Sequence, residues 1–214
     1  MIRHLIVRQP IELQDYQATL AKVDEMMNSD YKNDELWLVQ HPIVYTKGFA
    51  TPEAITKTRN GCDLIPVNRR GGISHHAPGQ LACYVNVDLK RLGIGPKMLI
   101  EMLEDITFDV LKEYGIKGER FDGIPGAYVD GKKIMLMGLN FTEKRTTFGF
   151  AINVSNDLSL FDCINLCGYK ELQVTNMQLA AGKTVTIRDV ANKITKAFIA
   201  KLGYKTHKIL NTLM

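Results

Sequence analysis

Hydrophobic positions recur at helical spacing in three stretches of the chain, each long enough for several turns. A period near 3.6 residues gives a helix one apolar face and one polar face. Pro96 begins the second stretch and Gly115 follows it, as is typical of helix starts and ends. The third stretch opens with a capping-box variant at Thr186 and stops before Gly203. The expected helices cover residues 11–28, 96–114 and 187–202.

Short apolar or alternating runs between these stretches predict β-strands. The clearest pair flanks Asp130-Gly131, a dipeptide that favours a tight hairpin turn. The strands lie between and beside the helices, without a regular alternation of strand and helix. This order favours an α+β fold, with a mixed or mostly antiparallel sheet packed with helices, over a doubly wound fold. The expected strands are residues 2–8, 36–39, 43–45, 64–67, 81–87, 128–129, 133–139 and 146–154.

Length and composition place the chain among ordinary globular proteins. Of its 214 residues, 45% are apolar and 23% are charged, which excludes the disordered, collagen-like and coiled-coil classes. The length corresponds to about one typical domain, so residues 1–214 are expected to form a single domain. The net charge of +4 comes from scattered basic residues, which argues against nucleic-acid binding. No apolar run approaches the roughly 18 residues of a membrane span.

The chain has four cysteines, and none of them forms a Cys-x-x-Cys pair. The N-terminal residues also lack the long apolar core of a secretory signal. Free thiols are typical of a reducing compartment, so we expect a cytoplasmic protein. The cysteines are Cys62, Cys83, Cys163 and Cys167.

The densest polar segment runs from Asn68 to Gln80 and contains three glycines, two arginines and two histidines. Glycine lets the backbone approach a ligand closely, and arginine and histidine add hydrogen-bond donors, so this is a candidate binding loop. A long surface turn has the same composition. Zinc binding by His75 and His76 is disfavoured, because adjacent side chains on an extended chain point in different directions.

A second glycine-containing segment, residues 181–184, ends like a phosphate-binding P-loop. The motif requires a glycine five residues before Gly182, and Met177 occupies that position. No apolar strand leads into the segment either. We therefore expect an ordinary turn before the last helix.

Two cysteines are candidate nucleophiles on the sequence alone. Cys167 precedes Gly168 in a polar stretch, where a neighbouring backbone N–H could bind an oxyanion. A lone cysteine is more often a small apolar residue, and Cys163 competes on spacing. Lys133 stands at a strand start, where a lysine is usually solvated.

Five segments, in order over roughly residues 35–170, resemble the lipoyl(octanoyl) transferase family. The segment from Arg69 to Gln80, followed by Leu81-Ala82-Cys83-Tyr84, is similar to the family signature Arg-Gly-Gly-x-x-Thr-Tyr-His-x-Pro-Gly-Gln. Five motifs that match in the same order are far more specific than any single motif. The other four segments are His41–Gly48, Gly131–Gly138, Gly149–Val154, and Asp157–Phe161 followed by Cys167-Gly168.

The resemblance assigns roles to particular residues. Cys167 falls on the family's acyl-accepting cysteine, and Lys133, rather than Lys132, falls on its partner lysine. The implied fold is related to the catalytic modules of lipoate and biotin protein ligases. The implied substrate-binding residues are Arg69, Arg70, Gly71, Gly72, Ile73, Ser74, His75, His76, Leu136, Met137, Gly138, Gly149, Phe150 and Ala151.

The resemblance also implies a reaction and its partners. Members of this family move an octanoyl group from acyl carrier protein to a lysine of lipoyl domains, as the first step of endogenous protein lipoylation. The implied acceptors are the lipoyl domains of 2-oxoacid dehydrogenase acyltransferase subunits and the glycine cleavage H protein. We expect no cofactor, no metal and no membrane or nucleic-acid partner, and we expect a monomer.

The chain departs from the family pattern at several positions, which leaves its acyl chain-length preference open. Arg70 stands in place of a glycine, His75 in place of an aromatic residue, and Phe148 in place of a histidine. Met135 and Leu136 are bulkier than the residues usual after Lys-Ile. Two other functions stay open: an ATP-dependent lipoate ligase of related fold, which needs no thiol, and a non-catalytic module that binds an acyl group or its carrier.

Overall fold

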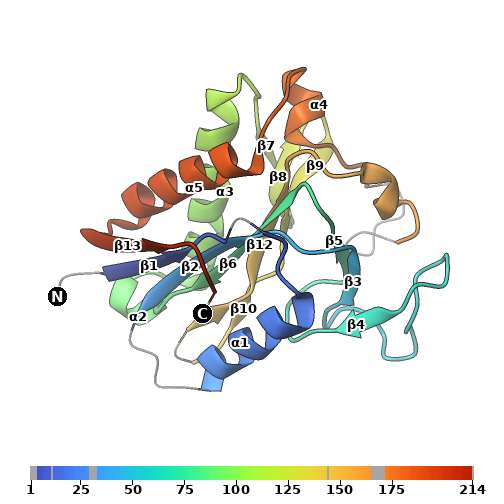
Figure 1. The fold of residues 1–214 in the computed structure, drawn as a ribbon, viewed down its shortest axis with the longest axis horizontal. Coiled ribbons are helices and arrows are strands. Elements are labelled where there is room, and N and C mark those ends of the chain that lie inside the picture. The colour runs from blue at the N-terminus through green and yellow to red at the C-terminus, as the bar shows by residue number, and fades with distance from the viewer. Residues whose placement is uncertain (1–3, 11, 29–32, 144, 165–171, 214) are drawn as a thin grey trace.

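A computed structural model describes residues 4–10, 12–28, 33–143, 145–164 and 172–213. Its centre is an eight-stranded sheet with the strand order β13-β1-β2-β6-β12-β9-β8-β7 (Figure 1). β1 pairs in parallel with β13 and with β2, and the other pairs are antiparallel. The strands are β1 (His4–Arg8), β2 (Asp34–Val39), β6 (Gln80–Asn86), β7 (Glu119–Phe121), β8 (Ile124–Val129), β9 (Lys132–Met137), β12 (Gly149–Asn153) and β13 (Thr206–Leu210).

Two smaller sheets lie at the sides of this centre. The three-stranded sheet has the order β4-β3-β5, and it stands beside the carboxyl-terminal half of β9. The two-stranded sheet joins β10 to β11. Their strands are β3 (Val44–Lys47), β4 (Leu64–Pro66), β5 (Ile73–His76), β10 (Asn140–Phe141) and β11 (Thr146–Thr147).

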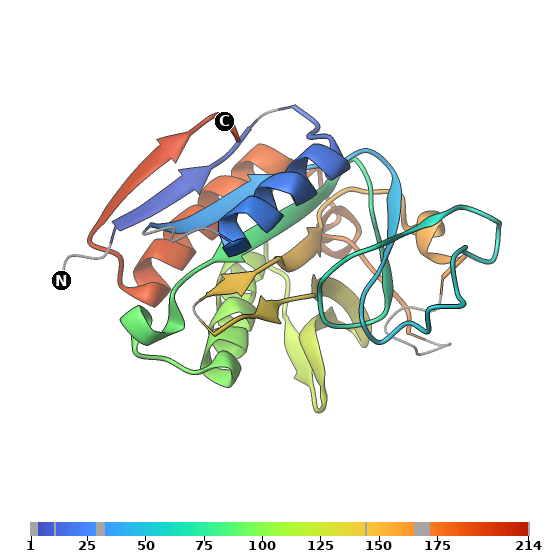
Figure 2. The ribbon, with the colours of Figure 1, turned by 90° about the horizontal axis from the view of Figure 1, so that it is seen from below.

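Helices cover both faces of the main sheet. α3 (Pro96–Glu113) and α5 (Ile187–Leu202) pack on one face, and their apolar sides form the largest core cluster with β2, β6 and β12. α1 (Tyr16–Asn28) crosses the other face, as Figure 2 shows. The shorter helices are α2 (Leu89–Leu92), α4 (Met177–Ala181) and the 3-10 turn η1 (Leu158–Phe161).

This arrangement confirms the predicted mixed α+β fold, and it corrects several boundaries. The first helix starts at Tyr16 rather than at residue 11, because the carboxylate of Asp15 accepts a hydrogen bond from the backbone of Ala18 and caps it. The segment from Asn68 to Gln80, for which a surface turn was one interpretation, contains the strand β5. β13 was not predicted, because its residues are mostly exposed and three of the five are polar.

The two helices predicted with the clearest end signals are confirmed within a residue or two. α3 has Pro96 in its first turn, and α5 has Thr186 at its N-cap and Gly203 at its C-cap. The hairpin at Asp130-Gly131 is confirmed as well, since both residues have positive φ and connect β8 to β9. Among the described residues, no helix is long and apolar enough to cross a membrane.

Candidate functional site

An open pocket lies between the central strands of the sheet, β5 and the start of α1. It encloses about 600 Å³ of space, part of which is open to solvent. Within the described part of the chain, every predicted substrate-binding residue except Arg70 and His75 lines it. Tyr16, Ala82, Cys83, Tyr84 and Phe148 also line it, and these were not predicted.

The floor of the pocket is open because small residues face it from adjacent strands. Ala151 of β12 lies opposite Ala82 of β6, and Gly149 lies opposite Tyr84. A Cβ atom on Gly149 would come within 2.0 Å of the Cys83 carbonyl oxygen, so only glycine lets these strands approach so closely. Alanine and glycine thus leave the space that larger side chains would fill.

The glycine-rich loop before β5 forms the rim of the pocket through its backbone. Phe49 and Ala50 donate their backbone N–H groups to the carbonyls of Arg69 and Gly71, at 3.1 Å each. The guanidinium of Arg69 is buried and donates to the Thr46 hydroxyl at 2.8 Å. The loop is therefore held against the strand that carries Thr46, and it is not a freely moving turn.

Histidine and tyrosine side chains form the inner wall. The His41 ring donates from Nδ1 to the Gln14 carbonyl at 2.7 Å, because a carbonyl can only accept, and Nε2 accepts from the Tyr84 hydroxyl at 2.9 Å. Burial lowers the pKa of His41 to about 4 and raises the pKa of Tyr16 to about 12. Burial also lowers the pKa of His76 well below its ordinary value. This wall is therefore polar but uncharged at neutral pH.

A chain of buried amides connects His76 to the strand that carries Lys133. His76 Nδ1 donates to the Gln80 side-chain oxygen at 2.8 Å, and Gln80 donates to Asn153 at 2.9 Å. Asn153 then donates to the Thr175 carbonyl at 3.0 Å, and the Thr175 N–H donates to the Lys133 carbonyl at 3.0 Å. The network fixes the tautomer of His76 and ties the pocket wall to β9.

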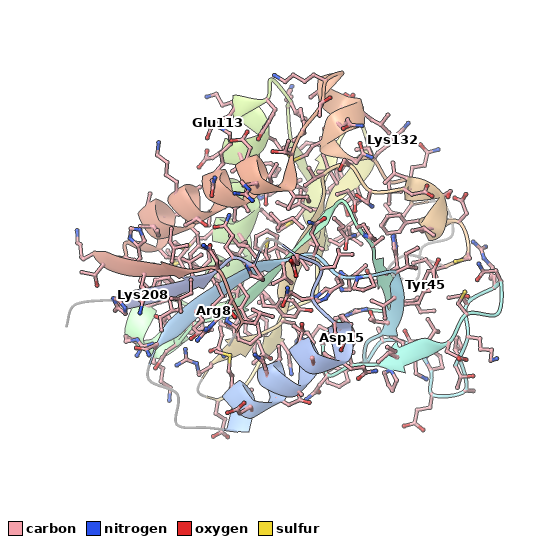
Figure 3. The ribbon with its side chains drawn as sticks, in the orientation of Figure 1. Arg8, Asp15, Tyr45, Glu113, Lys132 and Lys208 are labelled. Carbon is pink, nitrogen blue, oxygen red and sulfur yellow. The ribbon has the colours of Figure 1, made fainter. Side chains whose placement is uncertain are left out.

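Lys133 is buried, although it stands near the start of β9. Its side chain is 1% exposed, and Nζ donates to the Pro125 carbonyl at 2.8 Å and to the Tyr128 hydroxyl at 2.9 Å. Gly126 gives the ammonium its room, since a Cβ there would lie 2.9 Å from Nζ. The expectation that a lysine at this strand start is solvated is therefore wrong for Lys133, because Gly126 leaves room for its side chain inside the protein. The neighbouring Lys132 is exposed, and Figure 3 labels it near the start of β9.

The predicted nucleophile, Cys167, lies outside the described residues. The chain that follows it pairs with β9: the Lys133 N–H donates to the Gln173 carbonyl at 2.8 Å, and Val174 forms a parallel bridge with Lys133. The competing Cys163 is described, and it lines a separate surface hollow with Tyr45. Figure 3 shows Tyr45 on β3, at the side of the small sheet.

His75 and His76 point to opposite sides of β5. The buried ring of His75 packs edge-on against Phe161, with 4.0 Å between the ring centres, and burial lowers its pKa to about 4. Neither ring nitrogen of His75 has a hydrogen-bond partner within the described ranges. The described residues also contain no cluster of three or more His, Cys, Asp or Glu side chains placed to hold a metal.

The segment that ends like a P-loop is a turn between two helices. Gly182 caps α4 with φ of +62°, and α5 begins shortly after it. A helix precedes the segment, whereas a phosphate-binding loop follows a strand.

Comparisons with known proteins give a consistent result. The family described as the lipoyl protein ligase A/B catalytic domain matches residues 11–199. The octanoyltransferase of Vesicomyosocius okutanii is 35% identical over 196 residues, which cover 91% of this chain and 96% of that protein.

Two solved structures have a similar fold at low identity. A bipartite lipoate protein ligase from Thermoplasma acidophilum has a TM-score of 0.72 at 15% identity, covering 98% of this chain and 88% of that one. The biotin protein ligase of Aquifex aeolicus, in complex with biotin and ATP, has a TM-score of 0.56 at 13% identity, covering 94% and 71%. The predicted relation to ligase catalytic modules is confirmed for the fold.

Proposed function

Since the chain belongs to the octanoyltransferases of the lipoyl protein ligase A/B catalytic-domain family, which are acyltransferases of protein lipoylation, we propose a complete reaction for it. An octanoyl group passes from octanoyl-acyl carrier protein to Cys167 as a thioester. It then passes to a lysine of a lipoyl domain, in a 2-oxoacid dehydrogenase acyltransferase subunit or in the glycine cleavage H protein. Lys133 is the acid/base, and the protein acts as a monomer in the cytoplasm.

One observation carries the proposal: a buried lysine ammonium lies one strand beyond a residue that lines a pocket with an apolar floor. Leu136, which lines the pocket, pairs across the sheet with Gly126, and the Lys133 ammonium lies over Gly126. A carboxylic acyl thioester has the same two parts, a polar reacting end and an apolar tail. The site therefore suits a substrate of this shape.

The first step is a thioester exchange. The Cys167 thiolate attacks the carbonyl carbon of the donor thioester, and the bond from that carbon to the carrier's sulfur breaks. The carrier's sulfur takes up a proton from the Lys133 ammonium as it leaves, so Lys133 is then neutral and can accept a proton in the second step. An ammonium near the attacking sulfur favours its thiolate form, which is the role that we assign to Lys133 here. The exchange is close to isoenergetic, so it requires no ATP.

The second step forms an amide. The neutral amine of the acceptor lysine attacks the acyl-Cys167 carbonyl, the C–S bond breaks, and Cys167 leaves as a thiolate. The amine loses one proton, which Lys133 or the departing sulfur accepts. An amide is more stable than a thioester, so this step is downhill.

The pocket lining supplies binding energy for the octanoyl tail. At about 0.8 kcal/mol for each buried CH₂ group, the seven carbons beyond the carbonyl contribute about 5 kcal/mol. Ala82, Ala151 and Gly149 leave a smooth floor for such a chain. The same energy discriminates against much shorter acyl groups.

The test uses octanoyl-acyl carrier protein and an apo lipoyl domain, without ATP, followed by intact mass spectrometry. We expect the wild-type protein to gain one octanoyl mass with the donor alone, and the lipoyl domain to gain it when both are present. Cys167→Ser is expected to lose the adduct on the enzyme. Cys163→Ser is the matched control and is expected to keep it.

Other outcomes would point to the other functions. An adduct that survives in Cys167→Ser, or disappears in Cys163→Ser, contradicts the assignment of the nucleophile. A strict need for ATP would identify a lipoate ligase. Binding of the acyl carrier without any transfer would identify a non-catalytic module.

A further inference from the structure

Two apolar cavities of this molecule meet at one side chain, Phe148. The pocket described above reaches Tyr84 and Phe148, and a second, smaller cavity is lined by the same two residues. Val23 and Met26 of α1 and Trp37 of β2 line the second cavity as well. It therefore lies between α1 and the sheet face that α1 crosses in Figure 2. The two shared rings form the partition between the cavities.

Phe148 is held at this partition by an unusual backbone conformation. Its φ is +57°, which bulky residues rarely adopt, and it lies between β11 and β12. Its carbonyl accepts a hydrogen bond from the Val85 N–H at 2.6 Å, which fixes the backbone. The side chain is buried, and its ring centre lies 6.5 Å from that of Tyr84. Strained residues of this kind persist where the surroundings over-determine them, often at functional sites.

The partition stands at a distance that suits an eight-carbon chain. Ala151 lies opposite Leu136, and Leu136 lies opposite Gly126, over which the Lys133 ammonium is placed. This row of residues marks the reacting end of the pocket. Phe148 precedes Ala151 by three residues, about 10 Å along a strand, and Ala151 lies two strand spacings of about 4.8 Å from Gly126, so the partition stands about 14 Å from the ammonium. An octanoyl chain has seven C–C bonds of about 1.5 Å each, which span about 9 Å as an extended zigzag, and the Phe148 ring and the contact between carbonyl and ammonium take up the remaining distance.

We propose that Phe148 is the residue that sets the acyl chain-length limit, and that the cavity behind it is an extension of the acyl pocket from which the Phe148 ring separates it. The proposal rests on the octanoyl transfer proposed above. An octanoyl chain ends against the Phe148 ring, whereas a longer chain has to displace that ring. Removing the ring joins the two cavities, and the additional methylenes then reach Met26 and Trp37.

The first test compares octanoyl and dodecanoyl carrier protein as donors for Phe148→Ala. We expect the ratio of kcat/KM for dodecanoyl over octanoyl to rise at least about tenfold, because four further methylenes gain an apolar site. Phe148→Gly is the second variant, since glycine accepts the positive φ without strain and keeps the test possible if the alanine variant fails to fold.

Met26→Ala supplies the matched control. Met26 lines only the second cavity, so its truncation alone is expected to leave the ratio unchanged while the partition stands. Combined with Phe148→Ala, it is expected to favour still longer chains. A change in the ratio for Met26→Ala alone would contradict a closed partition.

A second readout does not depend on catalysis. Trp37 is the single tryptophan of the chain and lines the second cavity, so its fluorescence reports entry of a ligand there. We expect free dodecanoate to change the emission of Phe148→Ala but not that of the wild type. Octanoate is expected to leave the emission of both proteins unchanged.

The outcomes separate this proposal from the proposed function. An unchanged chain-length ratio in the folded variants overturns the role of Phe148 while octanoyl transfer stands. If the wild type transfers no octanoyl group, the proposed function fails. The role of Phe148 as a partition is then tested by the Trp37 fluorescence titration with dodecanoate alone. Equal emission changes in the wild type and in Phe148→Ala would overturn that role.

Discussion

The ammonium nitrogen of Lys133 lies 2.9 Å from the phenolic oxygen of Tyr128, and both side chains are almost fully buried. The same nitrogen lies 4.8 Å from the centre of the Tyr128 ring and donates to the Pro125 carbonyl. These contacts hold the lysine side chain in one position inside the protein. A buried charge is costly unless it is hydrogen-bonded. The hydrogen bonds to Tyr128 and to Pro125 therefore favour this one position of the ammonium over others inside the protein.

Lys133→Ala is expected to lower the rate of octanoyl transfer by about 10²–10⁴-fold, the usual contribution of a positioned acid/base. Lys132→Ala is the matched control, because Lys132 neighbours Lys133 and is exposed. It is expected to retain the wild-type rate. Transfer followed by intact mass spectrometry measures both. Equal rates for the two variants would remove Lys133 from the mechanism.

Tyr128→Phe is expected to change the pH dependence of transfer more than the affinity for the donor. The substitution removes the hydroxyl that accepts from Lys133 and keeps the ring. Because the hydroxyl acts through the lysine, the pH–rate profile should shift while KM stays near its wild-type value. A change confined to KM would contradict this positioning role.

Asn153→Ala is expected to destabilise the fold by about 1–3 kcal/mol, because it leaves the buried amide of Gln80 and the Thr175 carbonyl without their partner. In a protein of this size, that cost lowers Tm by roughly 2–12 °C. Thermal unfolding followed by circular dichroism measures it. Asn192→Ala, at an exposed site, is the control and is expected to shift Tm by much less.

The stability of the protein is expected to fall as the pH decreases from about 6.5 to about 4. Burial lowers the pKa of His41 and of His75 to about 4, whereas the unfolded chain titrates near 6.5. In this window the unfolded state binds protons that the folded state excludes, so acidification favours unfolding.

His75→Phe should make this loss less steep, by about 1.4 kcal/mol per pH unit. An aromatic ring also fits against Phe161, so the variant should be at least as stable as the wild type at pH 7. Urea unfolding at several pH values measures both effects, with the exposed His207→Ala as control. An unchanged slope would mean that His75 titrates normally in the fold.

Asp34→Ala is expected to cost about 3–5 kcal/mol, the usual result of breaking a buried ion pair. The Asp34 carboxylate is buried and accepts from Arg91, from Arg145 at 3.2 Å and from the Tyr204 hydroxyl at 3.0 Å. Asp63→Ala, which breaks the exposed pair with Lys57, is the control and should cost less than about 1 kcal/mol. Urea unfolding at neutral pH compares them.

Ordered motifs predicted most of the pocket lining, because the residues that face one cavity come from strands with recognisable local patterns. The missed residues have a physical explanation. Tyr16 reaches the pocket from a helix distant in sequence, and Tyr84 and Phe148 form a wall that only the packing of α1 on the sheet creates. Residue spacing contains no information on such a contact.

Two strands were not predicted from local pattern, for a related reason. His75 lies inside a strand because β5 pairs with β3, a contact that its polar neighbours did not indicate. β13 pairs in parallel with β1 across most of the chain, and a parallel partner leaves no turn signal in the sequence. Tertiary pairing overrides local propensity in both places.

The pairing of β1 with β13 also constrains how the protein can be made. His4 has Thr206 as its partner, so this ladder joins residues separated by nearly the whole chain. During synthesis, one edge of β1 stays open until residues 206–210 leave the ribosome. An unpaired edge strand is a template for association with other chains, so the nascent protein exposes the apolar β1 until the more polar β13 replaces it as the edge of the sheet.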